Sequence, residues 1–126
     1  MNTLADLLNF VVSTLQKFSY SKVVRVVESD DFSQQRFAFK VRAELVGGAT
    51  LQVRLYYNQG HIDYAYQLVR NNQPVLRWDN KEHFPEISSY PHHFHTPMGK
   101  IETSPLTGDL AHDLPFVLNH LASVEY

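Results

Sequence analysis

Hydrophobic residues repeat every three or four positions at both ends of the chain, which is the spacing of an amphipathic helix. At the N-terminal end, Thr3 precedes the repeat and Asp6 follows three positions later, in the manner of a capping box. At the C-terminal end, Asp113 is the predicted cap, and Pro115 is expected in the first turn. The two apolar stripes comprise Leu4, Leu7, Leu8, Val11, Val12, Leu15 and Phe18, and then Leu114, Val117, Leu118, Leu121 and Val124. The pattern therefore predicts one helix at each end, both packed on an apolar surface.

The middle of the chain alternates between hydrophobic and polar residues with period two, as β-strands with one buried face do. The clearest run has its apolar positions at Phe37, Phe39, Val41, Ala43 and Leu45. Turn-forming pairs separate such runs at residues 47–48, 59–60 and 71–72. With residues 22–28 as the first strand, we predict an α+β fold in which a five-stranded antiparallel meander is flanked by the two helices.

The strand register follows from the rule that residues opposite each other in a hairpin lie on the same face of the sheet. Matching apolar to apolar positions predicts connections at residues 47–49, 59–60 and 71–73. The buried face is then expected to include Leu51, Val53, Leu55, Tyr57, Ile62, Tyr64, Tyr66, Leu68, Leu76 and Trp78. The predicted rows on the other face are Glu44, Gln52, Gln67 and Arg77, followed by Arg42, Arg54, Ala65 and Asp79. Arg77 and Asp79 should therefore project beside Arg42 and Arg54.

The stretch from Asn80 to Asp109 follows the fifth predicted strand and is long for a connection in a compact domain. It contains four prolines and four of the seven histidines of the chain. Connections of this length usually have a function or contain short structure of their own. We expect a long, histidine-rich functional loop here.

Composition narrows the class of protein only modestly. A chain of 126 residues that is 44% hydrophobic suits one domain, residues 1–126, with a real core. The net charge of −2 gives no overall attraction to nucleic acid, so binding of RNA would need a local basic patch. The absence of cysteine excludes disulfides and thiolate metal ligands and fits a reducing compartment. No secretion signal or long apolar segment is evident, so we expect a cytoplasmic protein without a membrane span.

The histidine-rich segment suggests chemistry, because histidine exchanges a proton near neutral pH and binds metals when neutral. Metal-independent RNA cleavage is the first hypothesis: one histidine would accept the proton of a ribose 2′-hydroxyl, another would protonate the leaving oxygen, and an arginine would stabilise the charge on the phosphate. The candidate catalytic residues are Arg77, Asp79, His83, His92, His93 and His95. Arg77 would bind the phosphate and Asp79 would orient a histidine. Lys40, Arg42 and Arg54 would supply the local anion-binding surface.

Two other interpretations of the same residues stay open. In an extended segment, His93 and His95 share one side while His92 points away. With Asp79 or His83 as a third ligand and water as a fourth, this pair could bind a divalent metal such as zinc. This is the alternative to our expectation that the protein has no cofactor. The remaining interpretation is structural: the histidines and Asp79 would form hydrogen bonds that attach the loop to the sheet.

The residues that carry these hypotheses also resemble a known family. Tyr66, the run Arg77-Trp78-Asp79-Asn80, His83 and the run Tyr90-Pro91-His92-His93-Phe94-His95 are similar to the core motif of the TumE-like toxins. Two positions depart from the family pattern: Phe84 stands where a second histidine is common, and Lys81 where a small residue is usual. The resemblance implies the toxin of a prokaryotic toxin–antitoxin pair, silenced by a cognate antitoxin, and it supplies no chemical mechanism.

Together, these observations predict a toxin that acts on RNA through its Arg/Asp/His residues, with a ribonuclease or phosphodiesterase activity if it is an enzyme. The alternative is a non-catalytic interaction module, or a metal-binding protein, in which the histidine loop is structural. The expected partners are the antitoxin and RNA, and formation of a homodimer is left open.

Overall fold

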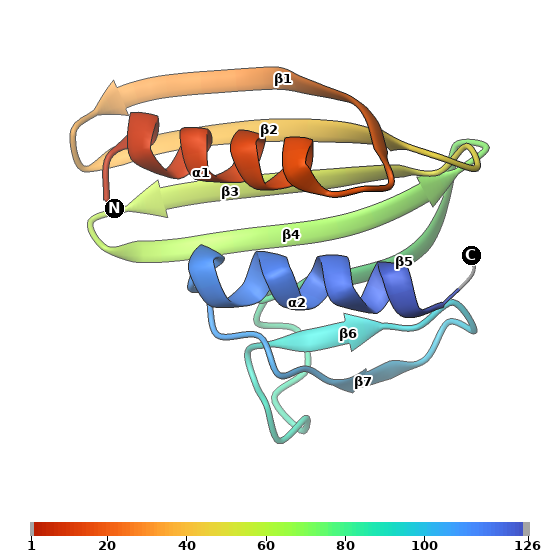
Figure 1. The fold of residues 1–126 in the computed structure, drawn as a ribbon. Helices are drawn as coiled ribbons and strands as arrows, with labels where there is room; N and C mark the ends of the chain where they lie inside the picture. The colour runs from red at the N-terminus through yellow and green to blue at the C-terminus, as the bar shows by residue number, and fades with distance from the viewer. Residues whose placement is uncertain (1, 125–126) are drawn as a thin grey trace.

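The computed structural model describes residues 2–124, in which two helices cover one face of an antiparallel sheet (Figure 1). The elements are α1 (Leu4–Lys17), β1 (Ser21–Ser33), β2 (Arg36–Leu45), β3 (Thr50–Asn58), β4 (His61–Arg70), β5 (Gln73–Asp79), β6 (His93–His95), β7 (Ile101–Thr103) and α2 (Leu110–Ser123). The strands lie side by side in chain order, so the α+β meander is confirmed. The described residues form seven strands rather than five, because two short strands lie within the predicted loop.

Both helices pack on the apolar face of the sheet, as predicted. Thr3 caps α1 by accepting a hydrogen bond from the Asp6 amide at 3.1 Å. The predicted cap of α2 was wrong: Asp109 caps this helix, so Asp113 lies in the first turn and Pro115 lies further inside. Asp113 does not cap the helix, because its carboxylate accepts hydrogen bonds from the amides of Thr107 and Gly108, which precede the helix. Neither helix within residues 2–124 is long and apolar enough to cross a membrane.

The predicted buried face of the sheet is confirmed: nine of its ten residues in β3, β4 and β5 are buried, and Ile62 is half-buried. The β3–β4 turn also lies at residues 59–60, as expected. The β4–β5 connection is shorter than predicted, because Asn71 and Asn72 both adopt left-handed backbone angles and form a two-residue turn. A register shift between Leu68 and Val69 compensates for the shorter turn, so Arg77 and Asp79 still pair with β4 as predicted.

The register between β2 and β3 differs from the prediction by two residues. Arg42 lies opposite Gln52, and Lys40 lies opposite Arg54. The connection is residues 46–48 rather than 47–49, because the Leu45 amide donates to the Ala49 carbonyl at 2.8 Å. A shift of two keeps each side chain on its predicted face, so only the neighbours along the polar face change.

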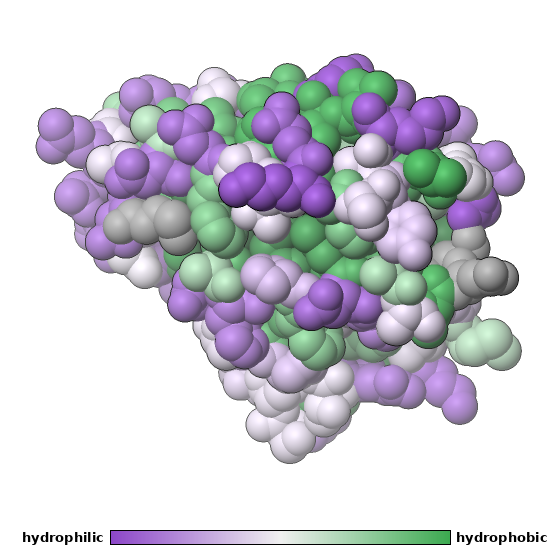
Figure 2. Space-filling view, viewed as in Figure 1, coloured by the Kyte–Doolittle hydropathy of each residue, from purple (hydrophilic) through white to green (hydrophobic). Residues whose placement is uncertain are grey.

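The two edges of the sheet differ from the prediction as well. β1 extends to Ser33, well beyond the expected residues 22–28, and exposes hydrophobic side chains along its length. Figure 2 shows hydrophobic surface along this edge of the molecule. At the other edge, the histidine segment forms β6, which pairs with β5 and with the short edge strand β7. His93 and His95 therefore lie in the sheet, whereas His83 and His92 lie in the connection before β6.

The core between the sheet and the helices contains Trp78, which is 2% exposed, as predicted. Its ring stacks on Phe94 of β6 at 4.6 Å between centroids and meets the edge of His120 of α2 at 5.1 Å. Trp78 thus attaches β6 and α2 to β5. Because side chains alternate along β5, the residues on either side of Trp78 must face away from the helices.

Candidate functional site

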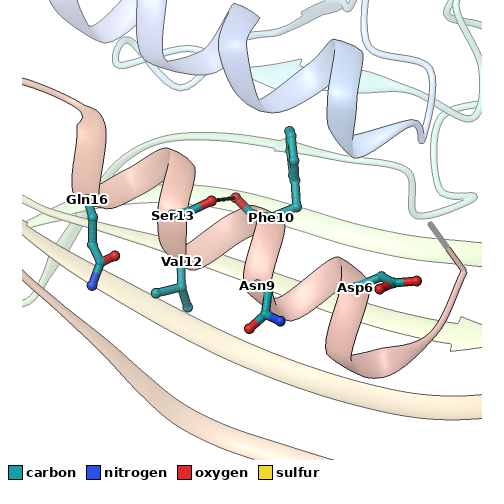
Figure 3. A pocket seen from close by; sticks show the side chains of 6 residues that line it. All are labelled: Asp6, Asn9, Phe10, Val12, Ser13 and Gln16. Carbon is teal, nitrogen blue, oxygen red and sulfur yellow. Dashed lines mark hydrogen bonds between the residues drawn. The ribbon is translucent and has the colours of Figure 1, made fainter.

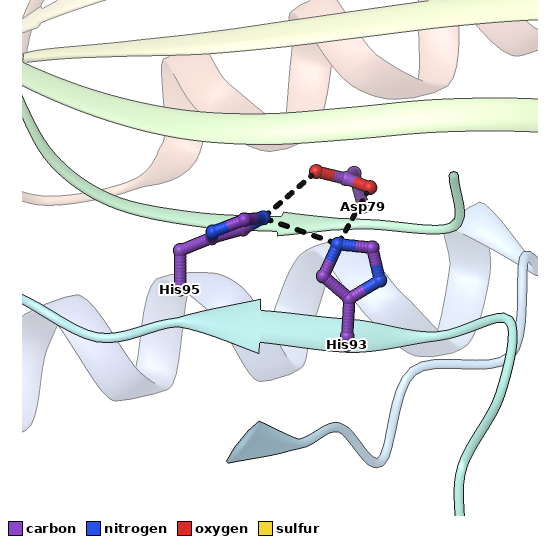
Figure 4. Close-up of side chains that lie close together, drawn as sticks. All are labelled: Asp79, His93 and His95. Carbon is purple, nitrogen blue, oxygen red and sulfur yellow. Dashed lines mark hydrogen bonds and ion pairs between the residues drawn. The ribbon is translucent and has the colours of Figure 1, made fainter. Parts of the chain in front are cut away.

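Four of the six candidate catalytic residues, Arg77, Asp79, His93 and His95, meet on the face of the sheet opposite the helices. Figure 4 shows Asp79, His93 and His95 of this group. Asp79 of β5 lies opposite His93 of β6, and Arg77 lies opposite His95 in the next pair of the same ladder. Pairing and alternation therefore place all four side chains on one face. The predicted sharing of one side by His93 and His95 is confirmed.

The carboxylate of Asp79 is the centre of this group. Its Oδ2 accepts a hydrogen bond from Arg77 Nε at 2.7 Å, and its Oδ1 accepts one from the Lys81 amide at 2.9 Å. The Nε2 atom of His93 lies 3.0 Å from Oδ1, and that of His95 lies 3.5 Å from Oδ2. The two Nε2 atoms are 3.1 Å apart. We call Asp79, His93 and His95 the Asp-His-His cluster.

The members of the cluster and Arg77 differ in how far they are exposed to solvent. Asp79 and His93 are each 2% exposed, and the ring of Phe84 meets His93 edge-on with 4.8 Å between centroids. The side chains of His95 and Arg77 are 34% and 30% exposed. Burial lowers the pKa of His95, against the opposing effect of the Asp79 carboxylate. The interior of the cluster is therefore closed to solvent, whereas one histidine and the arginine reach the surface.

A cavity of about 500 Å³ opens beside the cluster. It is lined by Arg77 and the Asp-His-His cluster, together with Lys81, His83 and Phe84. His83 is exposed and has its ring contact with Phe84, at 6.2 Å between centroids. Of the predicted site residues, His83 thus borders the pocket without joining the cluster.

His92 lies on the opposite face of the sheet. Its Nδ1 is 2.8 Å from the hydroxyl oxygen of Tyr64, whose side chain belongs to the core face, and the two rings stack. Burial lowers the pKa of His92. The expectation that His92 points away from its neighbour His93 is confirmed, and this residue is separated from the other candidates.

The three predicted substrate-binding cations share the polar face with the cluster but lie farther along the sheet. Lys40 pairs with Glu28 at 3.4 Å, and Arg42 donates to Gln52 at 2.8 Å. Arg54 is in line with Asp79 at a distance of two strand spacings, or about 10 Å. A second cavity of about 290 Å³ is bordered by both Arg54 and Lys81, so the two cavities lie next to each other.

Three residues that support the site were not predicted to do so. The side-chain amide of Asn80 accepts from the Tyr64 N–H at 3.0 Å and donates to the Ile62 carbonyl of β4, which attaches the start of the connection to the sheet. Phe84 covers His93, and the Pro91 carbonyl oxygen lies 3.1 Å from His93 Nδ1. A polar residue directly after a strand was the available signal for Asn80. The contacts of Phe84 and Pro91 depend on the path of the chain and had no local signal.

A larger hollow, of about 660 Å³, lies along α1 (Figure 3). Phe10 points from it toward α2, whereas Asn9 and Val12 point away from that helix. Of the described residues that line it, Asp6 alone is ionisable. Size alone therefore does not identify the site, and the chemically equipped cavity is the one beside the Asp-His-His cluster.

Comparison with known proteins identifies the family. A search of curated proteins and a search of solved structures each found no match. The family model described as Toxin TumE matches residues 12–124. This span contains the whole Asp-His-His cluster and its cavity. The chain therefore belongs to the TumE toxin family.

Proposed function

We propose that this protein is the toxin of a toxin–antitoxin pair and that it cleaves RNA in the cavity beside the Asp-His-His cluster. The observation that carries the proposal is the convergence of two histidines and an arginine on one buried carboxylate next to an open cavity. Membership of the TumE toxin family implies a cognate antitoxin partner. The absence of cysteine suits action in the reducing cytoplasm, where RNA is available.

Arg77 suits the role of a phosphate ligand. Its Nε–H donates to Asp79, which orients the guanidinium group, while the partly exposed side chain borders the cavity. The remaining N–H groups match two oxygens of a phosphate. Charge that develops on the phosphate during the reaction would be stabilised by this fixed cation.

His95 is the histidine of the cluster that a substrate in the cavity can reach, because its side chain is 34% exposed. Asp79 and His93 are almost fully buried, so we assign them the role of positioning residues for His95 and Arg77. The structural hypothesis from the sequence is thereby combined with a functional one. The same hydrogen bonds that attach β6 to β5 also orient the groups that face the cavity.

RNA is the substrate class that requires least from these residues, because the ribose 2′-hydroxyl is a nucleophile held beside the phosphorus atom. In the proposed step, a bond forms between the 2′-oxygen and phosphorus, and the bond from phosphorus to the 5′-oxygen breaks. The proton of the 2′-hydroxyl ends on the leaving 5′-oxygen. Lys81 and Arg54, which border the adjoining cavity, would contact neighbouring phosphates of the strand.

Cleavage of an RNA oligonucleotide by the purified protein tests the proposal, together with growth arrest in a host that lacks the antitoxin. We expect His95→Ala to lower the cleavage rate by about 100-fold or more and to abolish growth arrest. His61→Ala is the matched control, because His61 also lies near a carboxylate, that of Asp63, but at an exposed hairpin turn, and it lines neither of the two cavities. It should behave as the unmodified protein.

The same experiments contain the results that would reject the proposal. Growth arrest by a folded His95→Ala variant at the unmodified level would favour the non-catalytic interaction module instead. An oligonucleotide with 2′-deoxyribose at the cleavage position should resist the protein. Cleavage of that oligonucleotide at an equal rate would rule out attack by the 2′-hydroxyl.

A further inference from the structure

We propose that the Asp-His-His cluster is a binding site for one divalent first-row transition metal ion, with Zn²⁺ and Mn²⁺ as suitable probes. Three side chains supply one ligand atom each, and these atoms all lie within 4.8 Å of one another. Binding of the ion does not depend on RNA cleavage. Only the role given to the bound ion below rests on the proposed function.

The separations between the ligand atoms match those around a metal ion. The Nε2 atom of His93 is 3.0 Å from Asp79 Oδ1 and 3.1 Å from His95 Nε2, and the latter is 3.5 Å from Asp79 Oδ2. Ligand atoms at about 2.0–2.2 Å from a metal, separated by about 90–109°, lie about 2.8–3.6 Å from each other. The two imidazole nitrogens and the Asp79 carboxylate thus face one another at separations that suit a shared ion, with a different carboxylate oxygen nearest to each histidine (Figure 4).

When both rings are neutral, the cluster has too few hydrogen atoms to satisfy its close contacts, and a bound cation would satisfy them. The Pro91 carbonyl oxygen lies 3.1 Å from His93 Nδ1 and can only accept, so Nδ1 carries the hydrogen and Nε2 of the neutral ring presents a lone pair. This lone pair faces the Asp79 carboxylate and His95 Nε2. A single hydrogen on His95 satisfies one of the three contacts at a time, whereas a metal ion satisfies all three.

Residues around the cluster form hydrogen bonds that fix the orientation of the proposed ligands, as the outer residues of metal sites do. A hydrogen bond from the far ring nitrogen to a carbonyl, as in His93, selects the tautomer that binds metal through Nε2. Each oxygen of Asp79 accepts one hydrogen bond from outside the cluster, from Arg77 or from the Lys81 amide, which fixes the carboxylate plane. Because the ligands stand on paired strands, little rearrangement is needed on binding.

The donor set and the cavity indicate the kind of ion and its role. Two imidazoles and one carboxylate suit zinc, manganese, iron(II) or cobalt(II), and the absence of sulfur ligands disfavours copper(I). Three protein ligands leave positions open toward the cavity, which is typical of catalytic rather than structural metal sites. In RNA cleavage, an ion here would polarise a phosphoryl oxygen next to Arg77.

Metal titration of the protein without a histidine tag tests this site. The protein is stripped with a chelator and dialysed, and Zn²⁺ and Mn²⁺ are then titrated calorimetrically. We expect one ion per chain and an affinity at least about 100-fold weaker in His95→Gln. His95 is the ligand to change because it is partly exposed, and circular dichroism checks that the variant is folded. His83→Gln is the matched control, since His83 borders the same cavity outside the cluster, and it should bind as the unmodified protein does.

Failure to bind either ion with a dissociation constant below about 100 μM would overturn the site, as would equal affinity in the two variants. Cleavage assays on the same samples separate the two proposals. Stoichiometric binding without RNA cleavage would keep the metal site and reject the proposed function. Full cleavage by protein that binds no ion would keep the function and reject the metal site.

Discussion

Replacement of Asp113 by asparagine is expected to lower the free energy of unfolding by about 2–4 kcal/mol, an unusually large effect for so small a chemical change. Asp113 is fully buried in the first turn of α2. Its Oδ1 accepts hydrogen bonds from the Thr107 amide at 2.9 Å and lies 2.9 Å from His112 Nδ1. Its Oδ2 accepts from the Gly108 amide at 2.7 Å. The carboxylate thus holds the segment that leads from β7 into α2.

The magnitude follows from the two backbone donors that face the carboxylate. Asparagine has nearly the same shape, but one of its two terminal groups donates instead of accepting. With the NH₂ group at the Oδ1 position, the Thr107 N–H keeps only its longer contact, 3.1 Å, with the remaining oxygen; in the other orientation the NH₂ group meets the Gly108 N–H. One hydrogen bond to a charged acceptor, worth about 1.5–3 kcal/mol, is lost or lengthened, and the bond that stays becomes a neutral one, a further loss of about 1 kcal/mol.

Urea denaturation measures the change, with the fluorescence of the single tryptophan as the signal. Trp78 contacts α2 through His120, so it reports the loss of this helix from the sheet. Asp109→Asn is the matched control, because Asp109 caps the same helix and asparagine caps as well as aspartate; its effect should stay within about 0.5 kcal/mol. A loss below about 1 kcal/mol for Asp113→Asn, or equal losses in the two variants, would refute the reasoning.

Three further predictions concern other parts of the structure. Burial lowers the pKa of His120, so the unfolded chain binds a proton more readily in the window just below the ordinary pKa of 6.5, and stability is lost as the pH falls through it. The difference in unfolding free energy between pH 7.5 and 5.5 should therefore be smaller for His120→Gln, and an unchanged difference would contradict the assignment. Asn80→Ala should lower the unfolding free energy in urea by about 2 kcal/mol, because it leaves backbone groups of β4 unpaired; a neutral substitution would show that these bonds contribute little. Phe84→Ala should speed modification of His93 by diethyl pyrocarbonate, measured by mass spectrometry, whereas an unchanged rate would mean that Phe84 does not shield this ring.

The sequence by itself determined the two helices, the order of the long strands as a meander, and the faces on which the assigned side chains of β2 to β5 lie. Helical and strand periods are local properties, and apolar side chains must be buried wherever the chain then runs. The same period of two placed Arg77 and Asp79 on one face and separated His92 from His93 and His95. The pattern therefore identified the residues of the cluster as candidates, although it gave no distances between them.

Only the tertiary structure decided which of these residues touch. A register shift of two residues returns each side chain to its own face, so patterning could not distinguish the predicted neighbours of Arg42 from the observed ones. A strand of three residues, such as β6, is too short to show a period, and its pairing with β5 sets His93 opposite Asp79. The roles of Phe84 and Asp113 depend likewise on where two connecting segments return to the sheet and to α2. Contacts between segments far apart in the chain are set by the packing of the whole molecule, and no local pattern contains them.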